Sequence, residues 1–313
     1  MIWCLAGYMA GPWGIRMIDG VLWFFKNLLL AFYNIGYALT HLGQWLNWSD
    51  SQSMMRFIYY GGSRELFFAA LLIFVLATAL GMWRNQIMWA MVRVLEGIAN
   101  TVGRFFAWAG LFMVLQQIMI IFLQRLFRVS EISVGPLGMD FTKDLSWYGE
   151  ELKLYNAIII CMCATYTFVQ GGHVRVDLIY SAVRFRTKRV IDMFGSLFFM
   201  MPMATLIWMY AWFFLWRHLV TPKVSASDTL ERLMRKSQLL KWNVETIGFS
   251  PSGFDAYFLF KILLVTFTFM IFLQAVAFFF RSYLEWKEGE ASANKYLDKD
   301  VRGNGEEAVK SAY

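Results

Sequence analysis

The 313-residue sequence is poor in the residues from which disulfide frameworks and metal sites are built, with three cysteines, three histidines and five prolines. The odd cysteine count, with Cys161 and Cys163 inside an apolar run, predicts neither a disulfide framework nor a zinc site. His41, His173 and His218 form no His-Glu-x-x-His motif, and no pair of them lies at mid-membrane depth. Metalloprotease and bis-histidine haem chemistry are therefore excluded. We expect a protein that is not an enzyme and holds no cofactor.

Charged residues are also scarce, at 16% of the chain, whereas 58% of the residues are hydrophobic and 19% are aromatic. This composition is typical of an integral membrane protein and not of a soluble domain. The net charge of +7 comes from basic residues that flank apolar runs and form no single stripe. That arrangement favours contact with anionic phospholipid headgroups over nucleic-acid binding. Phospholipids are expected partners, and nucleic acid is not.

Five apolar segments are long enough to cross a hydrocarbon core of roughly 30 Å as helices. They are residues 65–83, 105–127, 152–170, 190–216 and 254–280. Residues 21–39 are ambiguous, because polar residues recur there near helical spacing, namely Lys26, Asn27, Asn34 and Tyr37. This segment either spans the membrane or lies in its interface. The sequence predicts an all-α, polytopic membrane protein.

The segments outside the spans also give predictions. The first twenty residues lack the charged region of a secretory signal, so we expect them to be retained. In the loop after residue 217, Asp228 and Glu231 resemble a capping box that opens a short amphipathic surface helix. Residues 284–313 are charged and low in hydrophobics, which predicts a largely disordered tail.

A dense basic cluster follows the span at residues 152–170. Five arginines and lysines lie between Arg175 and Arg189, which places this segment on the cytoplasmic face by the positive-inside rule. If residues 21–39 span, both termini are cytoplasmic. Asp192 is expected to pair with Arg189 or a neighbour and not to relay protons.

Polar residues inside the spans predict helix packing more than transport. Gln116 and Gln117 lie on one predicted helix, and the next carries polar residues at intervals of seven, four and three. That spacing places the second set on one face, which favours a seam bonded to a neighbouring helix over a conduction path. The second set is Asn156, Cys163, Thr167 and Gln170.

Inverted repeats and interrupted helices, which are typical of a self-sufficient secondary transporter, are scarce here. Only Pro202 interrupts a predicted span, and a proline kink is more often a packing feature than a site. A helical membrane protein with little active-site chemistry, several packing seams and one charged cytoplasmic hinge fits a partner subunit of a larger complex.

Residues 105–281 resemble the small permease (Q-type) subunit of tripartite ATP-independent periplasmic (TRAP) transporters. The motifs that carry the resemblance are Glu150-Glu151-Leu152, an apolar helix, and then Gly171-Gly172-His173-Val174-Arg175-Val176-Asp177-Leu178. The resemblance implies a four-helix core in residues 101–283 and makes residues 1–100 an extension with one or two more membrane helices. It also implies a bacterial inner-membrane location and a scaffold role in sodium-coupled uptake of an organic acid.

The partners implied by the resemblance are a large (M-type) membrane subunit, which moves as an elevator and binds the sodium, and a periplasmic substrate-binding protein. In the motif, Glu150 and Glu151 are expected at a helix N-terminus, where the macrodipole favours carboxylates. The segment that follows contains His173, Arg175 and Asp177, which either interlock to hold the turn or contact the partner subunit. Lipid headgroups are expected to contact Arg184, Arg186, Lys188 and Arg189.

Two other functional classes stay open. One is a membrane-anchoring or assembly subunit of a different multi-subunit complex, which would share the packing seams. The other is a stand-alone channel or carrier, in which Gln116, Gln117 and Asn156 would line a wet path.

Overall fold

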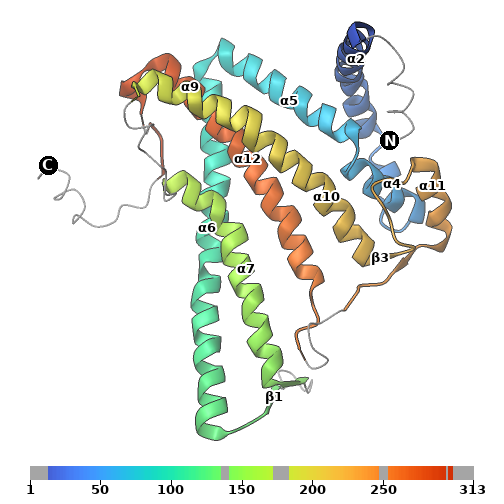
Figure 1. Cartoon of the computed structure of the whole chain (residues 1–313), viewed down its shortest axis with the longest axis vertical. Helices are drawn as coiled ribbons and strands as arrows, with labels where there is room; N and C mark the ends of the chain where they lie inside the picture. Colours follow the sequence, from blue (N-terminus) through green and yellow to red (C-terminus); the bar gives the residue numbers. More distant parts are fainter. Residues whose placement is uncertain (1–12, 135–140, 172–182, 247–252, 294, 299–313) are drawn as a thin grey trace, which may run out of the picture. The chain divides into compact units, whose positions relative to one another are not determined.

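The computed structural model describes residues 13–134, 141–171, 183–246, 253–293 and 295–298. The regular secondary structure of these residues is helical apart from two short two-stranded ladders, and six helical stretches are long and apolar enough to cross a membrane. The predicted class, an all-α polytopic membrane protein, is confirmed (Figure 1). The chain divides into two compact units. The first comprises residues 1–84, 202–249 and 255–268, and the second comprises residues 85–201, 250–254 and 269–313.

The first unit begins with four helices, α2 (Trp13–Thr40), α3 (Gly43–Leu46), α4 (Ser51–Gly61) and α5 (Arg64–Trp83). The start of α4 is capped by Asp50, whose carboxylate accepts hydrogen bonds from the backbone N–H of Gln52 and Ser53, both at 3.1 Å. The Ser53 hydroxyl donates to the same carboxylate at 2.8 Å, and these donors lower the pKa of Asp50.

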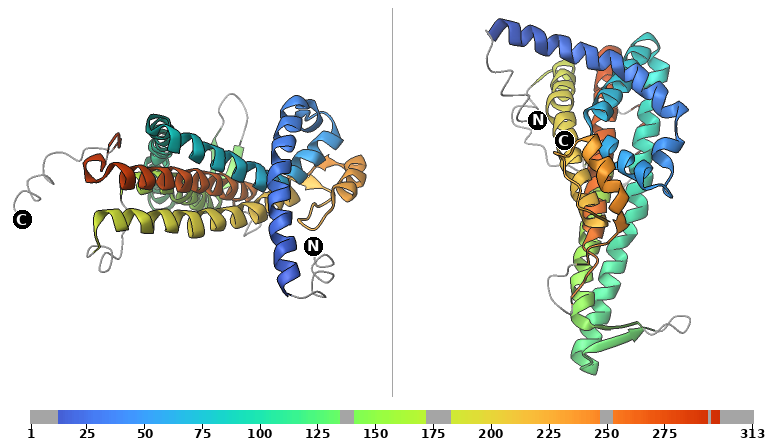
Figure 2. Two further views of the ribbon diagram at one scale, coloured as in Figure 1. Left: turned by 90° about the horizontal axis from the view of Figure 1, so that it is seen from above. Right: turned by 90° about the vertical axis from the view of Figure 1, so that its right-hand side faces the viewer.

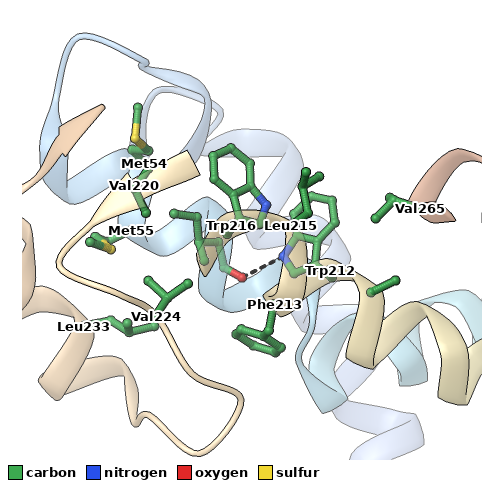
Figure 3. Close-up of a cluster of buried hydrophobic side chains, with 12 residues drawn as sticks. Met54, Met55, Trp212, Phe213, Leu215, Trp216, Val220, Val224, Leu233 and Val265 are labelled. Carbon is green, nitrogen blue, oxygen red and sulfur yellow. Dashed lines mark hydrogen bonds between the residues drawn. The ribbon is translucent and has the colours of Figure 1, made fainter. Parts of the chain in front are cut away.

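The core of the first unit forms where α4 packs on the end of α10 (Met201–Leu219), as Figure 3 shows. The Trp212 indole N–H donates to the Ile58 carbonyl at 2.9 Å, which links the two helices inside this core. A Cβ at Gly61 would lie 2.2 Å from the Trp212 ring. The close approach of α4 to α10 therefore requires a glycine at this position.

A short helix and a two-residue ladder complete the loop between α10 and α12 (Phe258–Glu288). The ladder pairs β3 (Val220–Thr221) with β4 (Lys241–Trp242) in antiparallel register. The helix, α11 (Leu230–Lys236), continues into a 3₁₀ turn at Ser237–Leu239. The predicted helix is present, but its N-cap is Thr229, whose hydroxyl accepts from the backbone N–H of Arg232. Asp228 instead forms an ion pair with Lys236 at 2.6 Å.

The second unit begins with α6 (Asn85–Phe122), which ends in a π-helical turn at Leu123–Phe127. This helix starts twenty residues before the predicted segment at 105–127, and it crosses the predicted domain boundary between residues 100 and 101. Residues Glu96 and Asn100 lower the hydropathy of its first half, yet both are buried on the same face as Met88 and Val92. Burial of that face against the rest of the unit accounts for the longer helix.

After α6 the chain forms a hairpin of β1 (Glu131–Val134) and β2 (Phe141–Asp144), and then α7 (Leu145–Gln170), which lies alongside α6 (Figure 1). The next span begins as α9 (Phe185–Gly195) and a π-helical turn at Ser196–Met200, and it continues without a break into α10. Pro202 lies in the first turn of α10, directly after the π-helical turn.

Helix α12 and the segment after it are ordered further than predicted. The helix continues to Glu288, a 3₁₀ turn follows at Glu290–Ser292, and the described residues reach Asp298. The Tyr296 ring packs edge-on against Trp89 of α6, at 5.7 Å between ring centroids. The expected disorder of the tail beyond a first helical turn or two is therefore not seen in residues 290–293 and 295–298, because contacts with α6 order them. Residues 299–313 lie outside the described part of the chain.

Candidate functional site

A network of buried charges joins three helices of the second unit. Its centre is formed by Glu96 of α6 and by Arg281 and Glu285 of α12, whose residues are 5%, 7% and 2% exposed. Ionisable side chains buried in apolar helices are costly, so they are usually paired and often mark functional positions. Among the described residues, this network brings together buried acidic and basic side chains from different helices, so we treat it as the candidate site.

The geometry at the centre is that of a two-pronged ion pair. The guanidinium of Arg281 donates through Nε to Glu96 Oε1 at 2.6 Å and through Nη2 to Glu96 Oε2 at 2.5 Å. Its third nitrogen, Nη1, donates to Glu285 Oε1 at 3.4 Å and to the carbonyl of Lys295 at 3.2 Å. Each guanidinium nitrogen therefore has an acceptor, which offsets the cost of burying the charge.

Arg189 of α9 extends the network to a third helix. Its Nη2 lies 2.6 Å from Glu285 Oε2, and its Nη1 donates to Asp192 Oδ2 at 3.1 Å. The contact with Glu285 has the distance of an ion pair but not the geometry of a hydrogen bond. The expected pairing of Asp192 with Arg189 is confirmed, and the Arg189 guanidinium, which was expected at lipid headgroups, contacts two carboxylates of this network.

Aromatic and polar groups surround the network on the side of the C-terminal segment. The Trp89 ring covers the Arg281 guanidinium at 5.5 Å, and its indole N–H donates to Glu288 Oε1 at 3.0 Å. Further along α6, Asn100 donates to the carbonyl of Asp298 at 2.9 Å. Asp298 also forms an ion pair with Arg104 at 2.9 Å. The segment after α12 is thereby fixed along α6.

Three carboxylates and two guanidiniums make up this network, so it carries one net negative charge if all five groups are ionised. Such an arrangement holds α6, α9 and α12 in one relative position, because any shift would separate buried opposite charges. No group of three or more histidine, cysteine, aspartate or glutamate side chains in the described residues is placed to hold a metal ion.

The glutamines predicted on the first family helix differ in environment. Gln116 of α6 is half-buried and donates to Glu151 Oε2 at 2.9 Å and to the Tyr148 carbonyl at 3.1 Å, so it joins α6 to α7. Gln117, one residue on, is exposed. Glu151 therefore pairs with a glutamine of the preceding helix.

The predicted polar seam on α7 is only partly assembled. Two of its members reach α6: the Cys163 thiol donates to the Gly103 carbonyl at 3.5 Å, and the Gln170 amide donates to Asn100 Oδ1 at 3.4 Å. Thr167 instead donates to the carbonyls of Cys163 and Ala164 in its own helix.

The reason for this split is the position of the contact line around α7. The close approach to α6 is made by Tyr166, which packs against Gly103. Thr167 lies about 100° further round the helix than Tyr166, and so faces away from α6. Asn156 is likewise exposed. Of the four predicted seam residues, Cys163 and Gln170 thus bond to α6, whereas Asn156 and Thr167 are exposed.

The motif residues at the two ends of α7 are partly described. The helix begins at Leu145, so Glu150 and Glu151 lie in its second turn and not at its N-terminus. The carboxylate of Glu150 accepts from the backbone N–H of Phe254 at 2.9 Å. Gly171 ends the helix in the left-handed conformation, with φ of 74°. The remaining motif residues, Gly172, His173, Arg175 and Asp177, lie outside the described residues.

The basic residues that follow the motif also differ from one another. Arg184 and Arg186 are exposed at the start of α9, which is compatible with contact to headgroups, and Lys188 is half-buried. The central trio of the network, Glu96, Arg281 and Glu285, was missed by sequence reasoning. The available signal was the spacing of Arg281 and Glu285, which are four residues apart at the end of an apolar helix.

Comparison of this chain with protein-family models, with curated proteins and with solved structures gave no match. The helical fold and its six candidate spans define the class of the protein, a multi-pass helical membrane protein.

Proposed function

We propose that this chain is the small membrane subunit of a TRAP transporter, located in a bacterial inner membrane. In this role it supports a large elevator-type subunit during sodium-coupled uptake of an organic acid, which a periplasmic binding protein delivers. The observation that carries the proposal is the buried network of Glu96, Arg281, Glu285 and Arg189, which fixes three helices against one another. A scaffold must remain in one conformation while its partner moves, and this network suits that requirement.

Two further observations support the proposal. The second of the motifs that resemble the TRAP small permease begins where α7 ends, at Gly171 in the left-handed conformation. In addition, α6 exposes large apolar side chains along its second half, such as Phe105, Trp108 and Phe112, each more than half exposed. A partner helix or lipid has to cover these side chains, since water cannot do so favourably.

The test is deletion of the chain in its native host, followed by an uptake assay. The assay uses the substrate of the periplasmic binding protein that an adjacent gene encodes. The proposal predicts that uptake is abolished, that the soluble component still binds its substrate, and that re-expression of the chain restores uptake. Uptake that survives deletion would contradict an obligate scaffold role.

A second test uses the motif after α7. The variant Arg175→Ala is expected to lower complex assembly or uptake without changing which substrate is carried. A changed substrate profile would contradict the scaffold assignment, because a scaffold does not contact the substrate. If Arg175 and Asp177 interlock, reversing the charge of Asp177 lowers assembly similarly, and exchanging the two residues restores part of the loss.

A further inference from the structure

Helix α2 sorts its polar and apolar side chains onto different arcs. At about 100° per residue, five of its polar residues lie within an arc of about 100°. They are Asp19, Lys26, Asn27, Asn34 and Tyr37. Apart from Tyr33, the apolar residues that are more than half exposed occupy a separate arc of about 100° on another side of the helix. They are Ile18, Val21, Leu22, Phe25, Leu29, Phe32 and Leu39. Two less exposed apolar residues, Trp23 and Leu30, lie on the polar side.

Both arcs are exposed in the structure, and the polar arc requires water or headgroups whereas the apolar arc requires hydrocarbon. Asp19, Lys26 and Tyr37 are exposed on the polar arc, and the Tyr37 hydroxyl donates to Gln44 Oε1 at 3.1 Å. In a spanning helix, Lys26 would face lipid about 12 Å from the end at Ile18, and a lysine inside the hydrocarbon core is costly. The boundary between headgroups and acyl chains offers water to one arc and hydrocarbon to the other.

The contact between α2 and α5, within the first unit, points to the same environment. Helix α2 runs across α5 and not along it (Figure 2). The crossing is made at Phe68 and Leu72, which form a buried cluster with Ala31. The rings of Trp23 and Phe24 pack edge-on against Phe68, at 5.6 and 5.5 Å.

The position of the crossing gives a depth. Phe68 and Leu72 lie four and eight residues after the start of α5 at Arg64, which is about 6 and 12 Å along the helix axis. An interfacial helix buries its apolar face about 5–10 Å into the boundary between headgroups and acyl chains. A spanning neighbour would also cover the far end of α5, where Leu80 and Trp83 are instead 51% and 83% exposed.

We infer that α2 does not cross the membrane but lies in the interface of the leaflet that contains the start of α5, with its apolar arc in the acyl chains. Its length and hydropathy alone would allow a span. The remaining five candidate spans then place the start of α5 and the end of α12 on opposite faces of the membrane. This inference does not depend on the proposed transporter function.

The test compares the two ends of α2 by labelling with a membrane-impermeant maleimide. In the full chain with Cys4, Cys161 and Cys163 replaced by serine, Asp19→Cys and His41→Cys are made singly and labelled in spheroplasts and in inverted vesicles. An interfacial helix predicts that both cysteines react from the same side. Reaction from opposite sides would overturn the inference.

A second measurement reads depth directly. Spin labels are placed at Phe25→Cys, Lys26→Cys, Leu29→Cys and Asn34→Cys in phospholipid vesicles, and accessibility to oxygen is compared with accessibility to a water-soluble nickel chelate. The inference predicts similar acyl-boundary depths at positions 25 and 29 and water access at positions 26 and 34. A depth that rises to the midplane near position 29 whichever arc is labelled would contradict it.

The matched control for depth is α5, which is also apolar and is of similar length. Its exposed side chains Leu66, Ile73 and Leu80 are replaced by cysteine and labelled in the same way. These positions should give a maximum depth at residue 73, as a spanning helix does. Because the α5 profile is measured in the same vesicles, a flat profile on α2 cannot be attributed to detachment of the protein from the membrane.

Discussion

The replacement Arg281→Met removes the guanidinium that occupies the centre of the buried network. Arg281 neutralises Glu96 through two short hydrogen bonds and also contacts Glu285. Without it, three carboxylates face the single guanidinium of Arg189. Breaking a buried ion pair by removing one partner typically costs about 3–5 kcal/mol, because the other charge stays buried and uncompensated.

The converse replacement, Glu96→Leu, should cost less. It leaves two carboxylates and two guanidiniums, so the remaining charges balance and Arg281 keeps its contact with Glu285. The double variant Arg281→Met with Glu96→Leu should cost less than the sum of the single variants, by about 0.5–3 kcal/mol. The order of the single variants follows from the charge count.

The assay is equilibrium unfolding of the purified chain in mild detergent. A denaturing detergent is titrated in, and unfolding is monitored by tryptophan fluorescence. Arg186→Ala is the matched control, since Arg186 lies exposed at the start of α9 and should change the free energy of unfolding by no more than about 0.5 kcal/mol. Equal costs for Arg281→Met and Glu96→Leu, or a cost for Arg281→Met as small as that of the control, would refute the reasoning.

Three further replacements test packing, a cap and a core hydrogen bond. Gly103→Ala should cost about 1–3 kcal/mol of unfolding free energy, because the added Cβ would lie 2.1 Å from the Tyr166 Cβ on α7. The control Gly97→Ala, whose Cβ would have no atom within 4 Å, should be neutral or slightly stabilising in the same titration. The lowered pKa of Asp50 means that its ionised form stabilises α4 above the ordinary value of 3.8 and that this stability is lost as the pH falls through the lowered pKa. The difference in unfolding temperature between wild type and Asp50→Asn should therefore be larger at pH 7 than at pH 3, and a difference independent of pH would contradict the cap. Trp212→Phe should cost about 1–3 kcal/mol, since it leaves the buried Ile58 carbonyl without its indole donor, and an unchanged unfolding free energy would show that this bond adds nothing.

The class of the fold follows from the sequence because length and apolarity alone identify a membrane helix. The helix boundaries could be predicted less accurately from the sequence. Hydropathy placed the start of α7 at residue 152, but the helix begins at Leu145, because polar residues can continue a helix beyond the apolar core. The same rule misplaced the start of α6, where Glu96 and Asn100 lower the hydropathy of a buried face.

The candidate site was harder to predict than the fold, for a physical reason. Glu96 and Arg281 are 185 residues apart in the sequence, and no local periodicity connects them. By contrast, Arg189 and Asp192 are three residues apart on one helix, and their pairing was predicted. Cys163 and Gln170 were placed correctly toward a neighbouring helix, but the packing of Tyr166 on Gly103 decided which side of α7 faces α6.

The central claim is that this chain is a scaffold for a larger membrane subunit. The most direct measurement is purification of the chain from its native membrane in mild detergent, with identification of the co-purified proteins by mass spectrometry. The proposal predicts one larger polytopic membrane protein in stoichiometric amount. A chain that is purified alone and still transports a solute in liposomes would contradict it, and co-purification with redox or secretion subunits would instead support an anchoring role in another complex.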